Sequence, residues 1–347
     1  MDRRIFITGT AGFIGFHLAR LLLSKGWNVH GFDALTDYYD VSLKKERHRI
    51  LSGSKSFSKT IARLEDSETL SKAVQAHQPE IIVHLAAQAG VRYSIESPKS
   101  YIDSNLVGTF NVLEQAKASD VSHLLMASTS SVYGTNRAMP FVEDAVTDTP
   151  MSLYAATKKA NEAMAHSYAH LFNTPTTMFR FFTVYGPWGR PDLALYKFVK
   201  AAIEGHSIDV FNYGEMARDF TYVSDLVRAI ERLLSVPPVT SSANPKNDGG
   251  NTPSAPYRVV NIGNGEKVPL MRFINATETA LGREIPKNFL PMQMGDVPET
   301  WANTDLLFDL TGYRPNTSVE QGIKSFVDWY LEYYQTSVSL SETTRVA

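Results

Sequence analysis

A glycine-rich turn between an apolar segment and an amphipathic segment is the feature that most restricts the fold of this chain. Residues 5–9 read Ile-Phe-Ile-Thr-Gly, which predicts a buried parallel strand that ends in a turn. Gly9, Gly12 and Gly15 stand three residues apart, and residues 13–25 have the apolar spacing of a helix. Glycines at such a turn let backbone N–H groups approach a pyrophosphate at the N-terminus of a helix.

The strand expected next ends in an acidic residue. Residues 28–33 predict that strand, and Asp33 lies 18 residues after Gly15. A carboxylate at this position can accept hydrogen bonds from both ribose hydroxyls of an adenosine, and it would repel a 2′-phosphate. The order of strand, glycines, helix, strand and acid therefore favours an NAD site over an ordinary strand–helix loop, and NAD over NADP.

Strand and helix patterns alternate up to about residue 184. Alternation of this kind predicts the α/β class, with a doubly wound parallel sheet that binds its ligands at the carboxyl ends of the strands. The strand with a small-residue end at 80–87 would let a cofactor pass close by. The further expected strands are 80–87, 123–128 and 176–182, and the expected helices are 67–76, 98–119 and 152–172.

Beyond about residue 185 the rhythm loosens, which predicts a smaller C-terminal α/β lobe that covers a substrate. Segment 237–256 is rich in Pro, Ser, Asn and Gly and predicts a mobile insertion. The expected division is a nucleotide-binding domain at 1–184, to which 219–236 and 257–263 return, a substrate lobe at 185–335 and a polar tail at 336–347.

The composition excludes several classes of function. The chain of 347 residues has 34 Lys and Arg against 36 Asp and Glu, a net charge of -2, which gives no sign of a nucleic-acid partner. It has no cysteine, which excludes disulfides and thiol catalysis, and its nine histidines show no metal-like spacing. No apolar run could span a bilayer, and no signal-peptide pattern precedes the first strand, so we expect a cytoplasmic protein without a membrane partner or a metal.

Tyr154 and Lys158 are the candidate catalytic pair. They are four residues apart in the helix expected at 152–172, so their side chains share one face. A nearby ammonium favours phenolate and would lower the Tyr154 pKa from its ordinary value of about 10. Such a phenolate could take the proton of a sugar hydroxyl while a hydride leaves the same carbon. The spacing of these two residues alone is also compatible with a Tyr and a Lys that stand four apart by chance on a solvated helix.

Asn105 is an unusual residue for the interior of the helix expected at 98–119, because Asn is a poor helix former. It is either a surface residue or a polar group that faces the cofactor cleft.

These features together resemble the extended short-chain dehydrogenase/reductase family of Rossmann-fold proteins, which includes the NAD-dependent epimerases and dehydratases. The residues that carry the resemblance are the three glycines, Asp33, Tyr154 with Lys158, and the segment Ser-Thr-Ser-Ser-Val-Tyr-Gly at 128–134. Segments 180–191, 214–222 and 295–301 are similar to the nucleotide-sugar 4-epimerases, and most of all to the UDP-glucuronate 4-epimerases.

The resemblance implies a tightly held NAD, a UDP-sugar substrate and inversion at C4 through a 4-keto intermediate. It implies that Tyr154 is base and then acid at the C4 hydroxyl, and that Lys158 holds the nicotinamide ribose. Thr129, with Ser131 nearby, would hydrogen-bond that hydroxyl, and Asn105 would support Lys158. The cofactor contacts expected are Gly9, Gly12, Phe13, Ile14, Gly15, Asp33, Leu85, Ala86, Ala87, Gln88, Asn105, Ser128, Tyr154 and Lys158.

The same resemblance assigns the substrate residues. Arg218 and Asp296 match positions that grip the diphosphate and the uridine ribose, and Phe211 matches the position beside the uracil. Two residues depart from the wider pattern. Arg63 stands where an Asp near the adenine is usual, and Gln293 replaces an Arg of the UDP-galactose 4-epimerases, which argues against that neutral-sugar group.

A uronic acid substrate adds a requirement, because its 4-keto form is a β-keto acid that can lose carbon dioxide. Arg190 is the candidate clamp for the carboxylate, since a guanidinium can grip it at two points, and Thr183 could add a hydroxyl contact. The alternative is a loop arginine that faces water.

Four rival functions differ in testable ways. The sugar 4,6-dehydratases carry Asp-Glu after the catalytic Thr, and the UDP-glucuronate decarboxylases carry a Glu two positions after it. Here these positions are Ser130 and Ser131, which cannot act as carboxylic acids. A UDP-glucose or UDP-N-acetylglucosamine 4-epimerase is the closest alternative, followed by the decarboxylase, and an NAD-binding sensor is the non-enzymatic one. Helices 98–119 and 152–172 pair across a two-fold axis in this superfamily, so we expect a homodimer.

Overall fold

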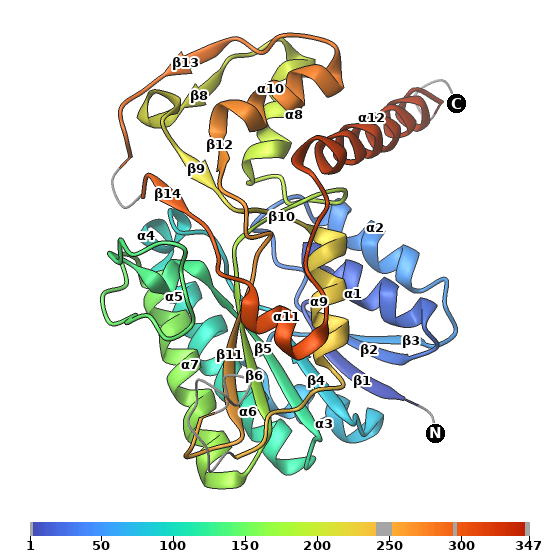
Figure 1. Cartoon of the computed structure of the whole chain (residues 1–347). Coiled ribbons are helices and arrows are strands. Elements are labelled where there is room, and N and C mark those ends of the chain that lie inside the picture. Colours follow the sequence, from blue (N-terminus) through green and yellow to red (C-terminus); the bar gives the residue numbers. More distant parts are fainter. Residues whose placement is uncertain (1–2, 241–251, 294–296, 344–347) are drawn as a thin grey trace.

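Seven parallel strands form the central sheet of the chain, which this computed structural model describes for residues 3–240, 252–293 and 297–343. The strand order is β11-β6-β5-β4-β1-β2-β3 (Figure 1). Successive strands are added on one side of β1 up to β3 and on its other side from β4 on. This is the doubly wound α/β fold that the sequence predicts. The strands are β1 Arg4–Thr8, β2 Asn28–Asp33, β3 Phe57–Ile61, β4 Ile81–His84, β5 His123–Thr129, β6 Thr176–Phe181 and β11 Tyr257–Ile262.

Helices cover both faces of the sheet, and each face has an apolar core. One core lies under α1, α2 and α9, and the other lies under α3, α6 and α7 (Figure 1). Strands buried on both faces account for the nearly continuous apolar sequences of β1, β4 and β5. The bounds are α1 Phe13–Ser24, α2 Val41–Leu51, α9 Val223–Leu233, α3 Ser67–His77, α6 Gly108–Ala118 and α7 Leu153–Phe172.

Two differences from the expected elements have physical reasons. The structure adds α2 and the edge strand β3, in a stretch for which the sequence predicted neither. The buried face of α2 includes Lys44, Arg47 and His48, so its apolar periodicity is weak. The helix expected at 98–119 is interrupted, because a π-helical turn at Ile102–Val107 separates α5, Pro98–Tyr101, from α6.

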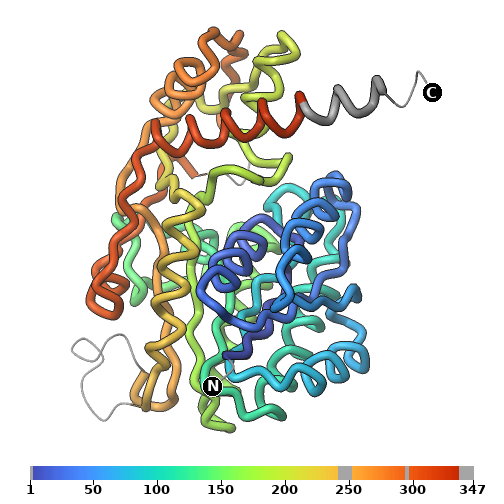
Figure 2. The backbone as a smooth tube through the Cα atoms, turned by 90° about the vertical axis from the view of Figure 1, so that its right-hand side faces the viewer, coloured from blue at the N-terminus to red at the C-terminus, as the bar shows by residue number. Residues whose placement is uncertain are grey.

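A smaller lobe covers the carboxyl ends of the strands (Figures 1 and 2). Its core packs α8, α10 and α12 against short strand pairs. In Figure 2 the last helix, α12, crosses above the N-terminal part of the sheet domain. The lobe contains α8 Ala194–Glu204, β8 Ile208–Val210, β9 Ala217–Arg218, β12 Val268–Pro269, α10 Leu270–Leu281, β13 Lys287–Phe289, β14 Glu299–Thr300 and α12 Val319–Thr343.

The chain passes between the two parts more than once. Strand β7, Thr183–Tyr185, pairs with β10, Phe220–Tyr222, below the lobe. The chain then returns to the sheet domain, where α9 packs against α1 and β11 pairs with β6. A short helix α11, Asp305–Thr311, also packs against α9 and β11. The expected boundary at residues 184 and 185 stays a prediction.

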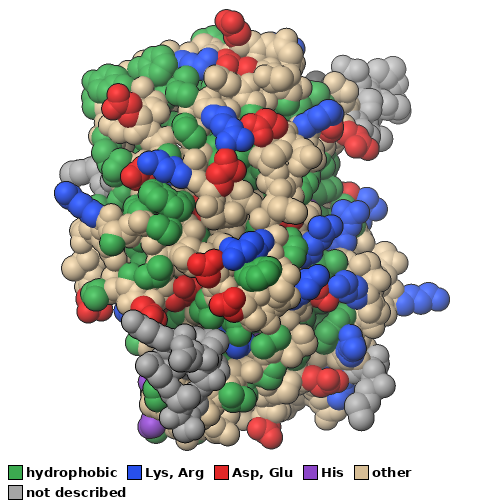
Figure 3. Space-filling model, viewed as in Figure 1, with side chains coloured by type: hydrophobic (Ala, Val, Ile, Leu, Met, Phe, Trp, Pro, Cys, Tyr) green, Lys and Arg blue, Asp and Glu red, His purple; other side chains and the backbone are tan. Residues whose placement is uncertain are grey.

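Parts of two expected segments lie outside the described residues. These are 241–251 of the expected insertion and, in the expected tail, residues 344–347 together with the side chains from 336 on. Within the described ranges, no helix is long and apolar enough to cross a membrane. Figure 3 shows Lys and Arg side chains interspersed with Asp and Glu over the visible face.

A buried ion pair ties the catalytic helix to the sheet. Arg180 of β6 donates from Nε and Nη2 to the two carboxylate oxygens of Glu162 on α7, each over 2.9 Å. The Ser128 hydroxyl at the end of β5 donates to the same carboxylate over 2.7 Å. All three residues are buried, so each charge depends on the other for its solvation.

Replacement of Arg180 by Met should therefore destabilise the fold strongly. It leaves the buried Glu162 carboxylate with only the partly exposed Lys159 ammonium, 3.9 Å away, and the loss of one partner of a buried pair costs about 3–5 kcal/mol in comparable proteins. Urea unfolding followed by circular dichroism measures the loss. The control is Arg49→Met, which removes an exposed arginine paired with Glu46 and should leave the transition unchanged. Equal transitions for the two variants would contradict this account.

Candidate active site

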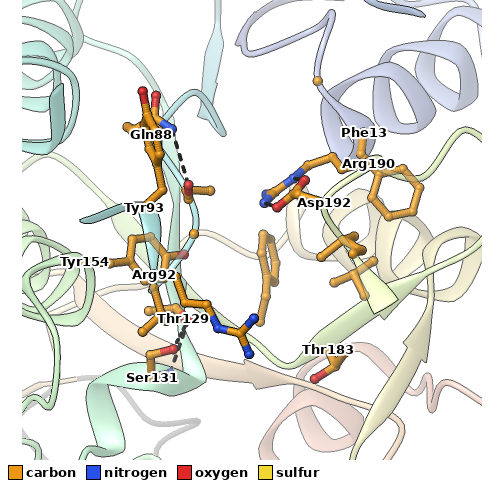
Figure 4. A pocket seen from close by; sticks show the side chains of 18 of the residues that line it. Phe13, Gln88, Arg92, Tyr93, Thr129, Ser131, Tyr154, Thr183, Arg190 and Asp192 are labelled. Carbon is orange, nitrogen blue, oxygen red and sulfur yellow. Dashed lines mark hydrogen bonds and ion pairs between the residues drawn. The ribbon is translucent and has the colours of Figure 1, made fainter. Parts of the chain in front are cut away.

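A cavity of about 1110 Å³ lies between the carboxyl ends of the strands and the smaller lobe. Its lining combines the glycine-rich turn, the ends of β2, β4 and β5, the first turn of α7 and residues of the lobe. Figure 4 shows side chains from both parts directed into it. The sequence-predicted residues that line it are Gly9, Gly12, Phe13, Ile14, Gly15, Asp33, Leu85, Ala86, Ala87, Gln88, Ser128, Thr129, Ser131, Tyr154, Lys158, Thr183, Arg190, Phe211, Arg218 and Gln293.

The glycine-rich turn is shaped for close backbone approach. Gly9 has a φ of +84°, and a Cβ atom there would lie 2.8 Å from the backbone nitrogen of Ala86. A Cβ atom on Gly15 would lie 2.1 Å from the carbonyl oxygen of Gly9, so only glycine fits. The N-terminus of α1 therefore opens on the cavity without side chains in front of its free N–H groups, which suits a pyrophosphate.

Asp33 ends β2 beside this turn. Its Oδ2 accepts from the backbone N–H of Ala11 and its Oδ1 from that of Leu35, each over 2.9 Å. A carboxylate has about four acceptor positions, so both oxygens can still accept from ribose hydroxyls. The glycine cradle and this oriented acid together fit a dinucleotide with a free 2′-hydroxyl.

The first turn of α7 presents the candidate catalytic pair to the cavity. The Ser152 hydroxyl caps the helix by accepting from the backbone N–H of Ala155 over 3.1 Å. Lys158, one turn after Tyr154, is 2% exposed, and its Nζ donates to the carbonyl oxygen of Ala127 over 2.9 Å. Burial lowers the pKa of Lys158 to about 8.

The electrostatics of Tyr154 differ from the sequence-based expectation. Burial raises the pKa of Tyr154, while the Thr129 hydroxyl and the charge of Arg190 act in the opposite direction. In the chain alone the pKa of Tyr154 thus lies above its ordinary value, whereas the sequence predicted a pKa below it. The Lys158 ammonium is instead directed to the backbone of β5, where it donates to the carbonyl oxygen of Ala127.

Thr129 and Ser131 lie together beside Tyr154 (Figure 4). Strand β5 ends at Thr129, and a 3₁₀ turn at Ser130–Tyr133 follows directly. The Thr129 hydroxyl donates to the Ser131 hydroxyl over 3.2 Å and accepts from the Ser131 backbone N–H over 3.2 Å. The turn therefore fixes two hydroxyl groups beside the phenol.

Asn105 does not line the cavity, which corrects the expected direct contact with the cofactor. It is fully buried in the π-helical turn. Its Oδ1 accepts from the backbone N–H of Gln88 over 2.8 Å, and its Nδ2 donates to the carbonyl oxygen of Gln88 and to the Thr157 hydroxyl. Asn105 thus holds the cavity wall at Gln88 and the catalytic helix at Thr157, rather than Lys158 itself.

Arg190 lines the cavity in an ion pair that sequence reasoning missed. Its Nε and Nη2 donate to the two carboxylate oxygens of Asp192 over 2.9 and 2.5 Å. The Tyr38 hydroxyl donates to the same carboxylate over 3.2 Å, and burial raises the pKa of Tyr38 to about 12. Since Asp192 is only two positions from Arg190, the spacing itself was the available signal. The Arg190 guanidinium carbon also lies 5.9 Å from the centre of the Tyr38 ring.

Arg92 is a further arginine of the cavity, and the sequence analysis did not identify it. It follows β4, and its guanidinium carbon lies 5.4 Å from the centre of the Phe211 ring in the smaller lobe. Figure 4 shows its side chain extending into the cavity from the side of Tyr154 and Ser131, with Arg190 and Asp192 on the other side of the view. The available signal was its place five residues after Ala87, where the expected strand with small residues at its end stops.

The remaining substrate candidates are held by the lobe. Arg218 donates from Nη2 to the carbonyl oxygen of Val297 over 2.7 Å and from Nη1 to that of Pro298 over 3.0 Å. Gln293 has a buried Oε1 without a described partner. Asp296 lies outside the described residues. Among the described residues, no group of three or more His, Cys, Asp or Glu side chains could hold a metal ion.

Comparisons with known proteins agree with this geometry. Residues 5–244 match the family model of the NAD dependent epimerase/dehydratase family. A probable UDP-glucuronate 4-epimerase of Rhizobium meliloti is 56% identical over 96% of this chain and 98% of its own. The crystal structure of UDP-glucuronic acid 4-epimerase from Bacillus cereus, in complex with UDP-glucuronic acid and NAD, superposes with a TM-score of 0.85, at 31% identity over 95% of this chain and 99% of its own.

A neutral-sugar enzyme is similar in structure as well. The UDP-glucose 4-epimerase of Thermotoga maritima, solved with UDP-glucose, has a TM-score of 0.82 at 26% identity, over 96% of this chain and all of its own.

Substitution of Gly15 by Ala should abolish the binding of a dinucleotide while the fold remains. The added Cβ would force the Gly9 carbonyl out of the turn, so the backbone N–H groups would lose their arrangement. Isothermal titration with NAD measures the loss. Gly53→Ala is the matched control, since that exposed glycine would meet one carbonyl oxygen at 3.2 Å. If Gly15→Ala bound NAD as the unchanged protein does, the turn would not be the dinucleotide site.

Proposed function

Because the chain belongs to the NAD-dependent epimerase/dehydratase family, we propose that it inverts C4 of UDP-glucuronate to give UDP-galacturonate. The single observation that carries the proposal is the convergence of Tyr154, Thr129 and Arg190 on the cavity that the glycine-rich turn opens. The uronate is favoured over neutral sugars by the identity of 56% to a probable UDP-glucuronate 4-epimerase. It is also favoured by Arg92 and Arg190, two of the arginines that line the cavity.

NAD is the cofactor, and when bound it accepts a hydride from the sugar and returns it. Gly9, Gly12 and Gly15 would face the pyrophosphate, and Asp33 would accept from the adenosine ribose. Residues 85–88, fixed through Asn105, would form the wall on the nicotinamide side. In this proposal the sheet domain at 1–184 holds the cofactor and the lobe at 185–335 holds the UDP-sugar.

Tyr154 is proposed to remove the proton of the C4 hydroxyl and later to return it. Burial alone works against the phenolate, so the reaction needs positive charge near the ring. Arg190 is the protein cation that acts in this direction. Thr129 and Ser131 would hold the hydroxyl toward the phenol, and Lys158 would reach the nicotinamide ribose.

The lobe supplies the groups that fit UDP. Phe211 offers an aromatic face for the uracil, and Arg218 offers a cation for the diphosphate, with Gln293 as a further polar contact. Asp296 is proposed for the uridine ribose from the resemblance alone. Arg190 and Thr183, which both line the cavity, would receive the uronate carboxylate.

The chemistry should be tested with the purified protein, UDP-glucuronate and no added reductant, with the products identified by NMR. A C4-inverted uronate supports the proposal. A pentose with carbon dioxide would indicate a decarboxylase instead. A parallel incubation with UDP-glucose distinguishes the neutral-sugar alternative, because inversion of that sugar alone would replace the proposed substrate.

Replacement of Tyr154 by Phe should lower turnover by about 10²–10⁴-fold, because it removes only the group that transfers the proton. Binding of UDP-glucuronate, measured by titration calorimetry, should change little. Tyr168→Phe is the control, since that hydroxyl lies further along α7 and bonds Glu114. Unchanged behaviour of Tyr154→Phe would favour the NAD-binding sensor over an enzyme.

A homodimer is proposed from exposed apolar side chains on the sheet domain. The π-helical turn, α6 and the end of α7 leave five large apolar residues solvent-exposed, whereas monomeric surfaces usually scatter such residues singly. These residues are Ile102, Val107, Phe110, Leu171 and Phe172.

Substitution of Phe110 by Glu should convert the dimer to a monomer, because it places a charge in the apolar contact. Light scattering coupled to size-exclusion chromatography measures the mass. The matched control is Phe308→Glu, which changes an exposed phenylalanine of α11. A monomer for the unchanged chain, independent of concentration, would count against the dimer.

A further inference from the structure

Arg47 is a fully buried arginine that the proposed chemistry does not use. It lies on α2, with none of its surface exposed. Its Nη1 donates to the carbonyl oxygen of Ala11 over 2.7 Å and to the Tyr39 hydroxyl over 2.8 Å, and its Nη2 donates to the carbonyl oxygen of Trp188 over 2.6 Å. No carboxylate of the described ranges pairs with it, so its charge is solvated by these three oxygens.

Arg47 bridges two loops, and one of them is the glycine-rich turn that would hold the dinucleotide. Ala11 lies between Gly9 and Gly12, and its backbone N–H donates to Asp33. Both sides of Ala11 are therefore fixed, the N–H by the acid that would face the adenosine ribose and the carbonyl by Arg47. A displacement of Arg47 would release the turn on the side opposite the cavity.

The other end is the loop that carries the uronate candidate Arg190. Trp188 precedes Arg190 by two residues and has a φ of +61°, a conformation that side-chain-bearing residues rarely adopt. Surrounding contacts hold it: its ring lies 5.4 Å from the Phe16 ring of α1, and His17 of α1 donates from Nε2 to the carbonyl oxygen of Pro187 over 2.8 Å. The loop is thus attached to the same helix whose N-terminus faces the dinucleotide.

We propose that Arg47 is a positioning residue that couples the dinucleotide turn to the Arg190 loop, so that a seated cofactor and a correctly placed uronate arginine require each other. This inference rests on the proposed function for the identity of the uronate. The guanidinium contacts the two carbonyl groups through two different nitrogens in one rigid plane, whereas the ammonium of lysine presents its three donors from a single nitrogen. Loss of the bridge would free the two loops separately.

The test compares Arg47→Lys with Arg49→Lys, an exposed arginine two positions along the same helix. Each NAD-loaded protein is titrated with UDP-glucuronate and with UDP, which has no carboxylate, and its retained NAD is measured after gel filtration. Arg47→Lys should lose NAD and should weaken UDP-glucuronate binding about tenfold more than UDP binding, while Arg49→Lys matches the unchanged protein. Loss of NAD with an unchanged ratio of the two affinities would overturn the coupling.

Hydrogen exchange on the unchanged protein keeps the proposal testable if Arg47→Lys does not fold. Removal of NAD should increase exchange at the amides of residues 188–190 as well as in the glycine-rich turn, and unchanged exchange in that loop would overturn the proposal. The two proposals fail separately. Absence of UDP-glucuronate binding by the unchanged protein would refute the function, whereas exchange in the loop still reports on the bridge.

Discussion

The close approach of the Gly9 carbonyl to the first turn of α1 fixes the position of the residues around the glycine-rich turn. A Cβ on Gly15 would lie 2.1 Å from that oxygen, so the turn exists only without side chains. With the turn closed, the free N–H groups of α1 face the cavity, and Ala11 comes within reach of Asp33 and Arg47. Asp33, on one side of the turn, and Arg47, which also contacts the loop before Arg190, are both arranged around this one backbone contact.

Charge in the cavity is distributed in a way that a sequence motif does not describe. The motif joins Tyr154 to Lys158, yet the lysine is turned to the backbone of β5 and its pKa falls to about 8 on burial. The cation that favours the Tyr154 phenolate is Arg190, far away in the chain and held by Asp192. A residue assigned to the substrate carboxylate is thereby also an influence on the base. An anionic substrate that meets Arg190 would alter the field at the phenol.

The order of strands and helices could be predicted because it depends on apolar periodicity and glycine placement, which are local. The turn at Gly9–Gly15, the acid at the end of β2 and the face shared by Tyr154 and Lys158 followed from the same signals. Helix α2 was not predicted from the sequence, because its buried face includes Lys44, Arg47 and His48 and so lacks a clear apolar stripe. Pairings between distant segments, such as Arg47 with Trp188 or Arg92 with Phe211, leave no trace in spacing and required the structure.

The position of β11 at the edge of the sheet has a consequence for how the chain matures. Its partner β6 is complete by residue 181, but β11 arrives only at residues 257–262, after α8, β8 and β9 of the lobe and after α9. Until then β6 presents an unpaired row of backbone donors and acceptors along a strand whose residues are all buried in the finished fold. During synthesis one edge of β6 therefore stays unpaired while some 75 residues are translated. At about 5–20 residues per second this takes several seconds, during which the edge can pair with another chain.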